Sequence, residues 1–370
     1  MCSTKWLQVT FIAECIGCCL SCALHMLLLT LILEKSRKKL GNYKYMMIAY
    51  SMCGILYSLC NFISKPNVHI TQKSFIIFSV SKTTSLPKSL GTISLSLYSS
   101  CYSMMLALFT VQFYYRFTSV VVPAAIVTRF SFKKMTFLFL YVVSFSAIEG
   151  LSSYFLTGPT ETKSLELRVE FEREYCLYPD EYAYIGPQYF YESLENGERQ
   201  FHVPSFLAIF LMSFMLISTF TVVIVFGIRT YRALSGTTLH LYSYKKLQIQ
   251  LFKTLSIQTL IPLVFMYLPV STIFVLPMIG VKVQAIANII PIFVAMYPCL
   301  EPLVAFIFMK DFKRRLLGGL FKFKFNLSTL ANLFLSISAY SRVMTVLFNP
   351  KPKHIVFISE SFNLKCPVLY

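Results

Sequence analysis

The segment that decides the fold is Gln200–Ile228, which reads QFHVPSFLAIFLMSFMLISTFTVVIVFGI and contains no Lys, Arg, Asp or Glu. About 20 mostly apolar residues are enough for a helix to cross the hydrocarbon core of a bilayer. Hydrocarbon offers the backbone no hydrogen-bond partner, so a segment that crosses it must be helical or part of a closed barrel. We therefore predict a transmembrane helix here, at about 205–228.

Six similar blocks are distributed along the rest of the chain. Thr254–Val281, Ser89–Tyr115 and Tyr45–Ser64 are also free of charged side chains, and the other three blocks carry one carboxylate each. A central acid costs about 2.5–3.5 kcal/mol, and a dozen apolar residues that contribute about 0.3–0.6 kcal/mol each outweigh it. The expected fold class is an all-α membrane protein, a bundle of seven transmembrane helices. The helices are predicted at about 9–33, 45–64, 90–114, 135–157, 205–228, 254–277 and 284–309.

The composition of the 370 residues agrees with this prediction. Hydrophobic residues make up 56% of the chain and charged residues only 14%, compared with about 25% charged residues in soluble domains. Too few polar side chains are present to cover the surface of a soluble protein of this size. A soluble enzyme, a disordered chain and a disulfide-rich secreted module are therefore disfavoured.

The basic residues predict how the helices are oriented. If the N-terminus lies outside, 24 of the 34 Lys and Arg residues fall on the inner side, in agreement with the positive-inside rule. Ten of the 16 acidic residues lie in the second outer loop, Thr157–Pro204. We therefore expect the N-terminus outside and the C-terminus in the cytoplasm. The net charge of +18 then faces anionic membrane lipid, and no binding of nucleic acid is expected.

The chain is expected to divide into a seven-transmembrane domain, residues 1–315, and a cytoplasmic tail, residues 316–370. The first outer loop, about 65–89, is expected to form a short hairpin or a lid over the helix mouths. Lys310–Leu317 alternates basic and apolar residues at helical spacing, which predicts a helix on the membrane surface. Leu327–Phe348 is apolar apart from Arg342, and it is either an interfacial or disordered segment or an eighth span.

No pattern of catalytic or metal-binding residues is found. The sequence lacks HExxH, GxSxG, P-loop and dinucleotide-binding motifs, and its five His residues are scattered. Cys15, Cys18, Cys19 and Cys22 form interlocked CxxC pairs, but on one continuous helix they point in different directions and cannot surround one ion. We therefore expect no enzymatic activity, no cofactor and no metal.

Polar residues and prolines inside the helices are candidates for function. Glu149 in the fourth helix either contacts a ligand or makes a structural hydrogen bond with a neighbouring helix. Arg116 ends the third helix at the inner face, where it is either an interface anchor or a latch that helix movement releases. Prolines favour bends, which suit both a bundle that swings helix 6 and the broken helices of a transporter. These prolines are Pro262, Pro269, Pro291 and Pro298.

A series of short motifs gives the sequence a family resemblance. In chain order they are LGNYKYMM at 40–47, Lys65-Pro66 with His69, FIIFS at 75–79, QFYYRF at 112–117, QLFKTLSIQTLIP at 250–262, MYLPVS at 266–271, YPCLEP at 297–302 and KDFK at 310–313. With these motifs the sequence resembles the nematode seven-transmembrane chemoreceptors of the Str type (serpentine receptor class r), a divergent branch of the G-protein-coupled receptors. The resemblance covers about residues 10–315.

The resemblance implies an olfactory-type receptor for a small odorant-like molecule, in the plasma membrane of sensory neurons and often in their cilia. Such a receptor signals through a heterotrimeric G protein. By position, Arg116 after Tyr115 would correspond to the arginine at the inner end of helix 3. Tyr297, Pro298 and Glu301 would fill the switch motif of helix 7. Three lysines would flank the G-protein surface, namely Lys245, Lys246 and Lys253.

The sequence also departs from the family and from the wider receptor class. Glu301 stands where the family usually has Asp. Aromatic residues flank Tyr115-Arg116 in place of the usual Asp-Arg-Tyr, so the acid–arginine pair of that motif cannot form locally. No cysteine lies at the outer start of helix 3 to pair with Cys176, which argues against the common outer disulfide.

We expect a ligand to enter from outside between helices 3, 5, 6 and 7 and to favour a state with helix 6 displaced. A pocket lined by Phe, Tyr, Ser and Met suits a small molecule that is uncharged or weakly polar. The main alternative is a small-solute transporter or channel, which should have charged residues facing each other across helices. An orphan receptor that acts as a trafficking or dimerisation partner is a third alternative. The residues expected to contact the ligand are Tyr98, Tyr102, Glu149, Phe210, Tyr267 and Asn288.

Overall fold

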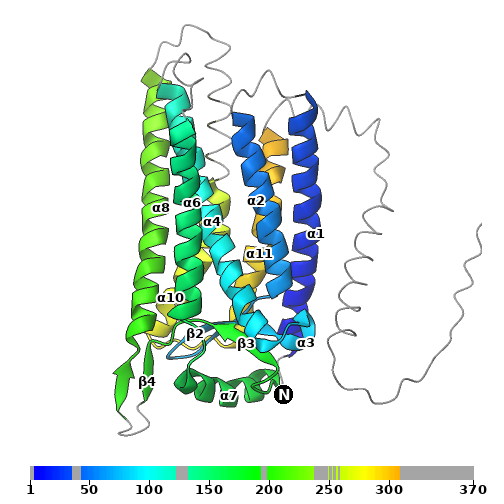
Figure 1. Ribbon diagram of the computed structural model, residues 1–370, viewed down its shortest axis with the longest axis vertical. Coiled ribbons are helices and arrows are strands. Elements are labelled where there is room, and N and C mark those ends of the chain that lie inside the picture. Colours follow the sequence, from blue (N-terminus) through cyan, green and yellow to red (C-terminus); the bar gives the residue numbers. More distant parts are fainter. Residues whose placement is uncertain are drawn as a thin grey trace, which may run out of the picture.

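The computed structural model describes residues 4–35, 43–121, 132–192, 198–236, 249, 252, 256 and 259–308. Within these residues, seven helices are long and apolar enough to cross a membrane, which confirms the predicted fold class. The helices stand side by side as one bundle (Figure 1). They span Thr4–Leu33, Lys44–Ser64, Lys88–Val121, Lys133–Phe155, Val203–Ser235, Thr259–Met278 and Ala285–Ile307.

The long α-helices of the bundle and the shorter elements between them keep the order of the chain. The long helices are α1 (Thr4–Lys35), α2 (Tyr43–Ser64), α4 (Lys88–Val121), α6 (Phe132–Phe155), α8 (Val203–Gly236), α10 (Leu268–Met278) and α11 (Ile289–Phe308). The short helices are α3 (Ser81–Thr84), α7 (Glu161–Tyr175), the π-helix η1 (Leu263–Tyr267) and the 3₁₀-helix η2 (Ala285–Asn288). The strands are β1 (Asn67–Ile70), β2 (Phe75–Val80), β3 (Tyr182–Ile185), β4 (Phe190–Glu192) and β5 (Arg199–Phe201).

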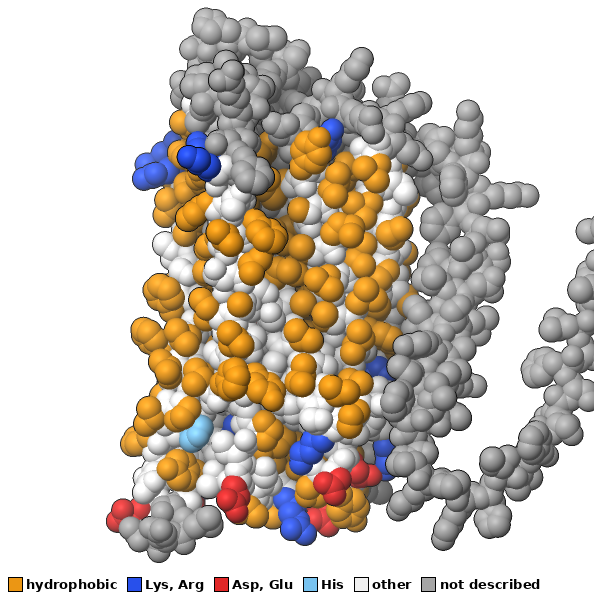
Figure 2. Space-filling model, viewed as in Figure 1, with side chains coloured by type: hydrophobic (Ala, Val, Ile, Leu, Met, Phe, Trp, Pro, Cys, Tyr) orange, Lys and Arg blue, Asp and Glu red, His pale blue; other side chains and the backbone are white. Residues whose placement is uncertain are grey.

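The outer surface of the bundle is apolar. Phe137 and Phe210 are 70% and 66% exposed, as expected of side chains that face lipid rather than water. Figure 2 shows hydrophobic side chains over the middle of the molecule and charged side chains near its ends. Because charged groups are costly inside hydrocarbon, this distribution agrees with a multi-pass membrane protein.

α4 is the central helix of the bundle. In its most apolar stretch 72% of the residues are buried, and it packs against α2, α6 and α8. Small residues let two of these helices approach closely, as is usual between transmembrane helices. The hydroxyl oxygens of Ser100 on α4 and Ser146 on α6 lie 2.8 Å apart. One turn along α6, a Cβ atom at Gly150 would lie 3.0 Å from the Cβ atom of Ser100.

One end of the bundle is closed by a structure that we call the cap, namely the sheet β1–β2–β3 together with α7 (Figure 1). β1 and β2 form an antiparallel hairpin between α2 and α4, and β2 pairs with β3 from the segment between α6 and α8. The expected hairpin is therefore present, and it also lies over the helix mouths. The cap lies at the end where α1 begins, which we call the cap end.

The sheet of the cap is buried on both faces. Phe75 and Ile77 of β2 face the bundle, where they line a cavity. Ile76 and Phe78 point the other way and pack against Phe171 on α7. Because side chains alternate along a strand, the apolar run FIIF serves both faces at once. The sheet therefore acts as a layer between the bundle and α7.

Several helices extend beyond their predicted ends. α1 begins at Thr4, and α4 and α8 continue to Val121 and Gly236. The prediction stopped these helices near charged side chains, but a helix can continue after it leaves the hydrocarbon. Further predictions fall outside the described residues, namely the surface helix at 310–317, the tail at 316–370 and the alternatives for 327–348.

Candidate functional site

A cavity lies directly under the cap. The sheet roofs it with Val68, Phe75, Ile77 and Ile185, and α4, α6, α8, α10 and α11 form its walls. The cavity has a volume of about 80 Å³, smaller than the roughly 300–1,000 Å³ of sites for drug-sized ligands. Most of its surface is apolar, so it suits a small and largely apolar molecule. Its polar side chains belong to Tyr98, Ser99, Tyr102, Ser103, Glu149, Ser153 and Thr157.

Three of the six residues that the sequence predicts as ligand contacts line this cavity. Tyr98 and Tyr102 lie one turn apart on the same face of α4, and Glu149 faces them from α6. The Tyr102 hydroxyl donates a hydrogen bond of 3.3 Å to the carbonyl oxygen of Met266 in η1. Glu149 is buried and accepts a long hydrogen bond of 3.5 Å from the hydroxyl of Ser153. Among the lining residues that the structure describes, Glu149 is the only charged one.

The other three predicted contacts do not line the cavity. Phe210 is 66% exposed on the outer face of α8, whereas Met212, two residues later, lines the cavity. Residues two apart on a helix point in nearly opposite directions, so Phe210 faces lipid. Tyr267 is buried, and its hydroxyl lies 2.9 Å from that of Thr219 on α8. Asn288 is fully buried and accepts a hydrogen bond of 2.8 Å from the backbone N–H of Val68.

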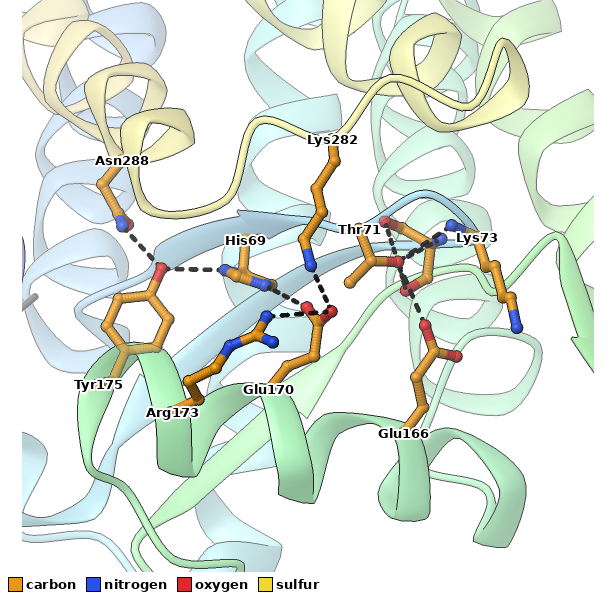
Figure 3. Close-up of polar contacts among 10 residues, drawn as sticks. His69, Thr71, Lys73, Glu166, Glu170, Arg173, Tyr175, Lys282 and Asn288 are labelled. Carbon is orange, nitrogen blue, oxygen red and sulfur yellow. Dashed lines mark hydrogen bonds and ion pairs between the residues drawn. The ribbon is translucent and has the colours of Figure 1, made fainter. Parts of the chain in front are cut away.

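A network of polar contacts joins the cap to the bundle (Figure 3). His69 on β1 places Nε2 2.9 Å from the carboxylate of Glu170 on α7. Lys282, in the segment before η2, contacts the same carboxylate at 2.6 Å. The other ring nitrogen of His69 lies 3.1 Å from the hydroxyl of Tyr175, which accepts a hydrogen bond of 3.2 Å from Asn288. The α2–α4 loop, the α6–α8 loop and the start of helix 7 are therefore tied together through four side-chain contacts.

Glu170 is the ionised centre of this network. Its partial burial would raise the pKa, but the hydrogen bonds and charges of His69 and Lys282 outweigh burial and lower the pKa to about 2. Arg173, one turn further along α7, adds a weaker contact at 4.0 Å. The carboxylate thus stays charged at neutral pH and holds two partners from different elements, the His69 ring and the Lys282 ammonium group.

A second hub of the cap is Lys163, whose side chain is completely buried. Its ammonium group donates to the carbonyl oxygens of Thr157, Gly158 and Gly186 at 3.1, 2.8 and 2.8 Å. Burial lowers the pKa of Lys163 to about 7, although the charge of Glu166 acts in the opposite direction. Thr157 and Gly186 also line the cavity, so Lys163 fixes part of the cavity wall from behind.

The sequence interpretation overlooked this network, although a signal for it exists. Lys163, Leu167, Phe171 and Tyr175 follow each other at intervals of four residues and are all buried on α7. Such spacing is typical of an amphipathic helix, and it could have predicted a helix that packs on the cap. Cys176, directly after this helix, is disulfide-bonded. Cys101 on α4 is free, so this bond is not the common one to helix 3.

The predicted switch residues gather in the half of the bundle away from the cap. Tyr297 on α11 is buried, and its hydroxyl lies 2.6 Å from that of Tyr50 on α2. Tyr115 packs into a buried cluster with residues of α1 and α11. Pro298 lies inside α11, and Glu301, one turn later, is buried with Oε1 lacking a hydrogen-bond partner among the described residues.

The remaining predicted switch positions are described only in part. Arg116 belongs to α4, but its side chain lies outside the described part of the structure. Lys245, Lys246 and Lys253 also fall outside it.

Helix 6 departs from α-helical geometry beside the cavity. The π-helix η1 follows Pro262 directly. Proline lacks the N–H that an α-helix needs for its backbone ladder, and a wider turn accommodates this loss. Because the Met266 carbonyl oxygen in η1 receives the hydrogen bond from Tyr102, this irregular turn is in contact with the cavity wall.

Both the sequence and the fold resemble known proteins. The model of the serpentine-type 7TM GPCR chemoreceptor family Str matches residues 10–317. Serpentine receptor class r-10 of Caenorhabditis elegans is 30% identical over 319 residues, which cover 85% of this chain and 92% of that receptor. G-protein coupled receptor str-33 of the same species is 26% identical over 290 residues, which cover 78% and 84% of the two chains. The crystal structure of squid rhodopsin matches 84% of each chain with a TM-score of 0.59 at 12% identity, which is a likeness of fold.

Proposed function

Because this chain belongs to the serpentine-type seven-transmembrane GPCR chemoreceptor family Str, we propose that it is an olfactory-type receptor that activates a heterotrimeric G protein. The observation that carries the proposal is the cavity under the cap, where five helices meet beneath the sheet. The proposed ligand is a small, uncharged or weakly polar molecule. The apolar wall and the few hydroxyl groups of the cavity support this class of ligand.

We further propose that the cap faces the outside of the cell and that the opposite end faces the cytoplasm. With this orientation, 24 of the 34 Lys and Arg residues lie on the cytoplasmic side, as the positive-inside rule expects. The proposed location is the plasma membrane of a sensory neuron, in its cilium. The family to which the chain belongs supports this location.

The proposed mechanism is a shift between two arrangements of helices 6 and 7. A ligand in the cavity contacts Tyr102, whose hydroxyl holds the Met266 carbonyl oxygen of η1. A ligand that competes for this hydroxyl would loosen η1 from α4 and favour the arrangement with helix 6 displaced. The ligand can shift the equilibrium only to the extent that it binds this arrangement more tightly.

At the cytoplasmic end, the proposed G-protein surface comprises the end of helix 3 and the beginning of helix 6. Tyr115 and Arg116 lie in the last two turns of α4, and Lys245, Lys246 and Lys253 would flank the surface. Tyr297, Pro298 and Glu301 are the proposed switch in α11. The hydrogen bond between Tyr297 and Tyr50 supports a role in holding the resting arrangement of α2 and α11.

The experiment is a screen of small apolar and weakly polar compounds in cells that report G-protein activation. For a compound that activates the receptor, Met212→Ala should raise the half-maximal concentration about tenfold or more, because this change removes apolar contact from the cavity wall. Phe210→Ala is the matched control on the same helix. Its side chain faces away from the cavity, so the half-maximal concentration should stay unchanged.

Arg116→Ala separates ligand binding from signalling in the same cells. The variant should reach the cell surface, as measured by labelling of an outside epitope, and should fail to signal at any ligand concentration. Normal signalling from Arg116→Ala would contradict the switch role. Equal responses of Met212→Ala and the unchanged receptor would contradict the cavity as the ligand site.

A further inference from the structure

Besides the cavity under the cap, a groove lies on the lipid-facing side of the bundle, at the end away from the cap. It runs between α4, α6 and α8 and has a volume of about 430 Å³. Apolar and aromatic side chains form most of its surface, and two lysines stand at its mouth. Its lining includes Val111, Tyr114, Lys133, Lys134, Tyr141, Val222 and Phe226.

The floor of the groove is built from aromatic contacts. The ring of Tyr114 on α4 packs edge-on against Phe226 on α8, with ring centres 5.5 Å apart. Tyr141 on α6 packs against Phe145 with ring centres 4.8 Å apart. Few contacts join α6 directly to α8 in comparison with those that either helix makes with α4. The groove therefore lies between these two helices, with α4 behind it.

The charges around the groove are of one sign. Lys133 and Lys134 lie in the first turn of α6 and are exposed, and Arg229 and Arg232 are exposed on the neighbouring α8. No Asp or Glu occurs in the described residues of α4, α6 and α8 that belong to this end of the bundle. In Figure 2, the acidic side chains in view gather at the cap end, whereas Lys and Arg side chains also lie at the opposite end.

The length of the groove matches one leaflet of a bilayer. From Lys133 to Tyr141 the axis of α6 rises about 12 Å, at 1.5 Å per residue. One leaflet contributes about 15 Å to the hydrocarbon core. A lipid whose headgroup lies beside the lysines would therefore place the greater part of one acyl chain against the aromatic floor.

From this arrangement we propose that the groove binds an anionic phospholipid. Its phosphate and any acidic headgroup lie between Lys133 and Lys134, whose stems extend along the helix to the membrane surface. One acyl chain lies along Val111, Tyr114 and Val222. The ligand comes from the leaflet at the end away from the cap, which is the proposed cytoplasmic side, where anionic lipids are enriched. The bound lipid packs against α4 one residue before Tyr115.

The test uses the purified full-length chain after reconstitution in vesicles of equal parts phosphatidylcholine and phosphatidylserine. The protein is extracted in mild detergent, and the lipid that remains bound is identified by mass spectrometry. The unchanged chain should retain phosphatidylserine in preference to phosphatidylcholine. The double variant Lys133→Ala/Lys134→Ala should lose about 10- to 30-fold in apparent affinity for phosphatidylserine, at about fivefold for each lysine.

Two further variants distinguish a specific binding site from general charge attraction. Lys82→Ala/Lys88→Ala removes the same charge from the cap end and should leave retention unchanged. Val222→Trp fills the groove and should reduce retention of phosphatidylserine although every lysine is present. Equal retention by all variants, or equal retention of the two lipids by the unchanged chain, would overturn the proposal.

Competition with glycerophosphoserine, which has the headgroup without acyl chains, addresses the role of the groove itself. This compound should not displace the lipid at millimolar concentration. If it does, the lysines bind a phosphate alone, and the proposal of a lipid groove is wrong. The experiment measures lipid binding and uses neither a receptor agonist nor a G protein. A negative result here therefore leaves the proposed receptor function untouched.

Discussion

At the scale of the residue, the stability of the cap depends on the carboxylate of Glu170. Glu170→Gln keeps the shape of the side chain but removes the charge that faces His69 and Lys282. We expect the variant to lose about 1–3 kcal/mol of cap stability, as is usual when a hydrogen bond to a charged group is lost. Hydrogen exchange of the amides in α7 and β1 should measure this loss as faster exchange.

Glu172→Gln provides the control on the same helix, because Glu172 is exposed. The pH dependence gives a second check. Since the pKa of Glu170 is lowered to about 2 from an ordinary value of 4.5, its contribution is complete above pH 4.5 and is lost as the pH falls towards 2. Unchanged exchange in Glu170→Gln would show that the network does not hold the cap.

Lys163 predicts a pH dependence in a different range. Its pKa is lowered by burial to about 7 from 10.5, so between these values the opened cap binds the proton more tightly than the closed cap. The stability of the cap should therefore increase as the pH rises from 7 to 10.5. The measurement is exchange of the α7 amides, corrected for the intrinsic effect of pH on exchange.

Lys163→Met should remove this slope, because methionine fills much of the same space and does not titrate. The exposed Lys82→Met is the matched control and should retain it. A slope that persists in Lys163→Met would assign the pH dependence to another group.

The sequence could indicate which residue types matter, but not which way each side chain faces. Tyr98 and Tyr102 were predicted as ligand contacts and line the cavity, whereas Phe210 was predicted on the same grounds and faces lipid. In a soluble helix, polar residues mark the outer face. In α8 both faces are apolar, one towards lipid and one towards the bundle, so that signal is missing.

At the scale of the element, the contact between α1 and α11 depends on the absence of a side chain at Gly17. A Cβ atom there would lie 2.6 Å from the carbonyl oxygen of Ala295, and a backbone atom cannot move aside easily. We expect Gly17→Ala to destabilise the bundle by about 1–3 kcal/mol through overpacking. Thermal unfolding in detergent or nanodiscs should show a lower midpoint.

Gly227→Ala is the comparison for this substitution. A Cβ atom at Gly227 would meet the ring of Phe113 at 3.5 Å, which is an ordinary contact. Alanine is also the better helix former by about 1 kcal/mol, so this variant should be as stable as the unchanged chain or more so. If both variants behave alike, close approach of α1 and α11 is not what the glycine provides.

The long elements were the easiest to predict, and the cap was the hardest. Stretches with at most one charge give a strong signal because hydrocarbon excludes charge, and all seven helices were found in this way. The sheet of the cap gives only a weak signal in the sequence. β2 pairs with β3, and the paired residues Ile77 and Ile185 are far apart in the chain. Neither strand is long enough to show a clear alternation, so their pairing depends on contacts that a single sequence does not reveal.

At the scale of the whole molecule, the proposed orientation can be tested with epitopes at the two ends of the chain. An epitope at the N-terminus should be accessible to antibody on intact cells, and one at the C-terminus only after the membrane is made permeable. The uneven distribution of Lys and Arg is the physical reason. Asn326-Leu-Ser328, a glycosylation motif in the predicted cytoplasmic tail, should carry no sugar. Sugar on Asn326, or a C-terminal epitope readable on intact cells, would reverse the orientation.

The sheet above the cavity has a kinetic consequence. The roof of the cavity is buried on both sides, so a molecule that leaves through the cap must wait until α7 and the strands separate. Local openings of this kind are slow compared with the movement of side chains. In the receptor role proposed above, the response would then continue after the stimulus has gone. It would follow the average ligand concentration over an interval and smooth out rapid fluctuations.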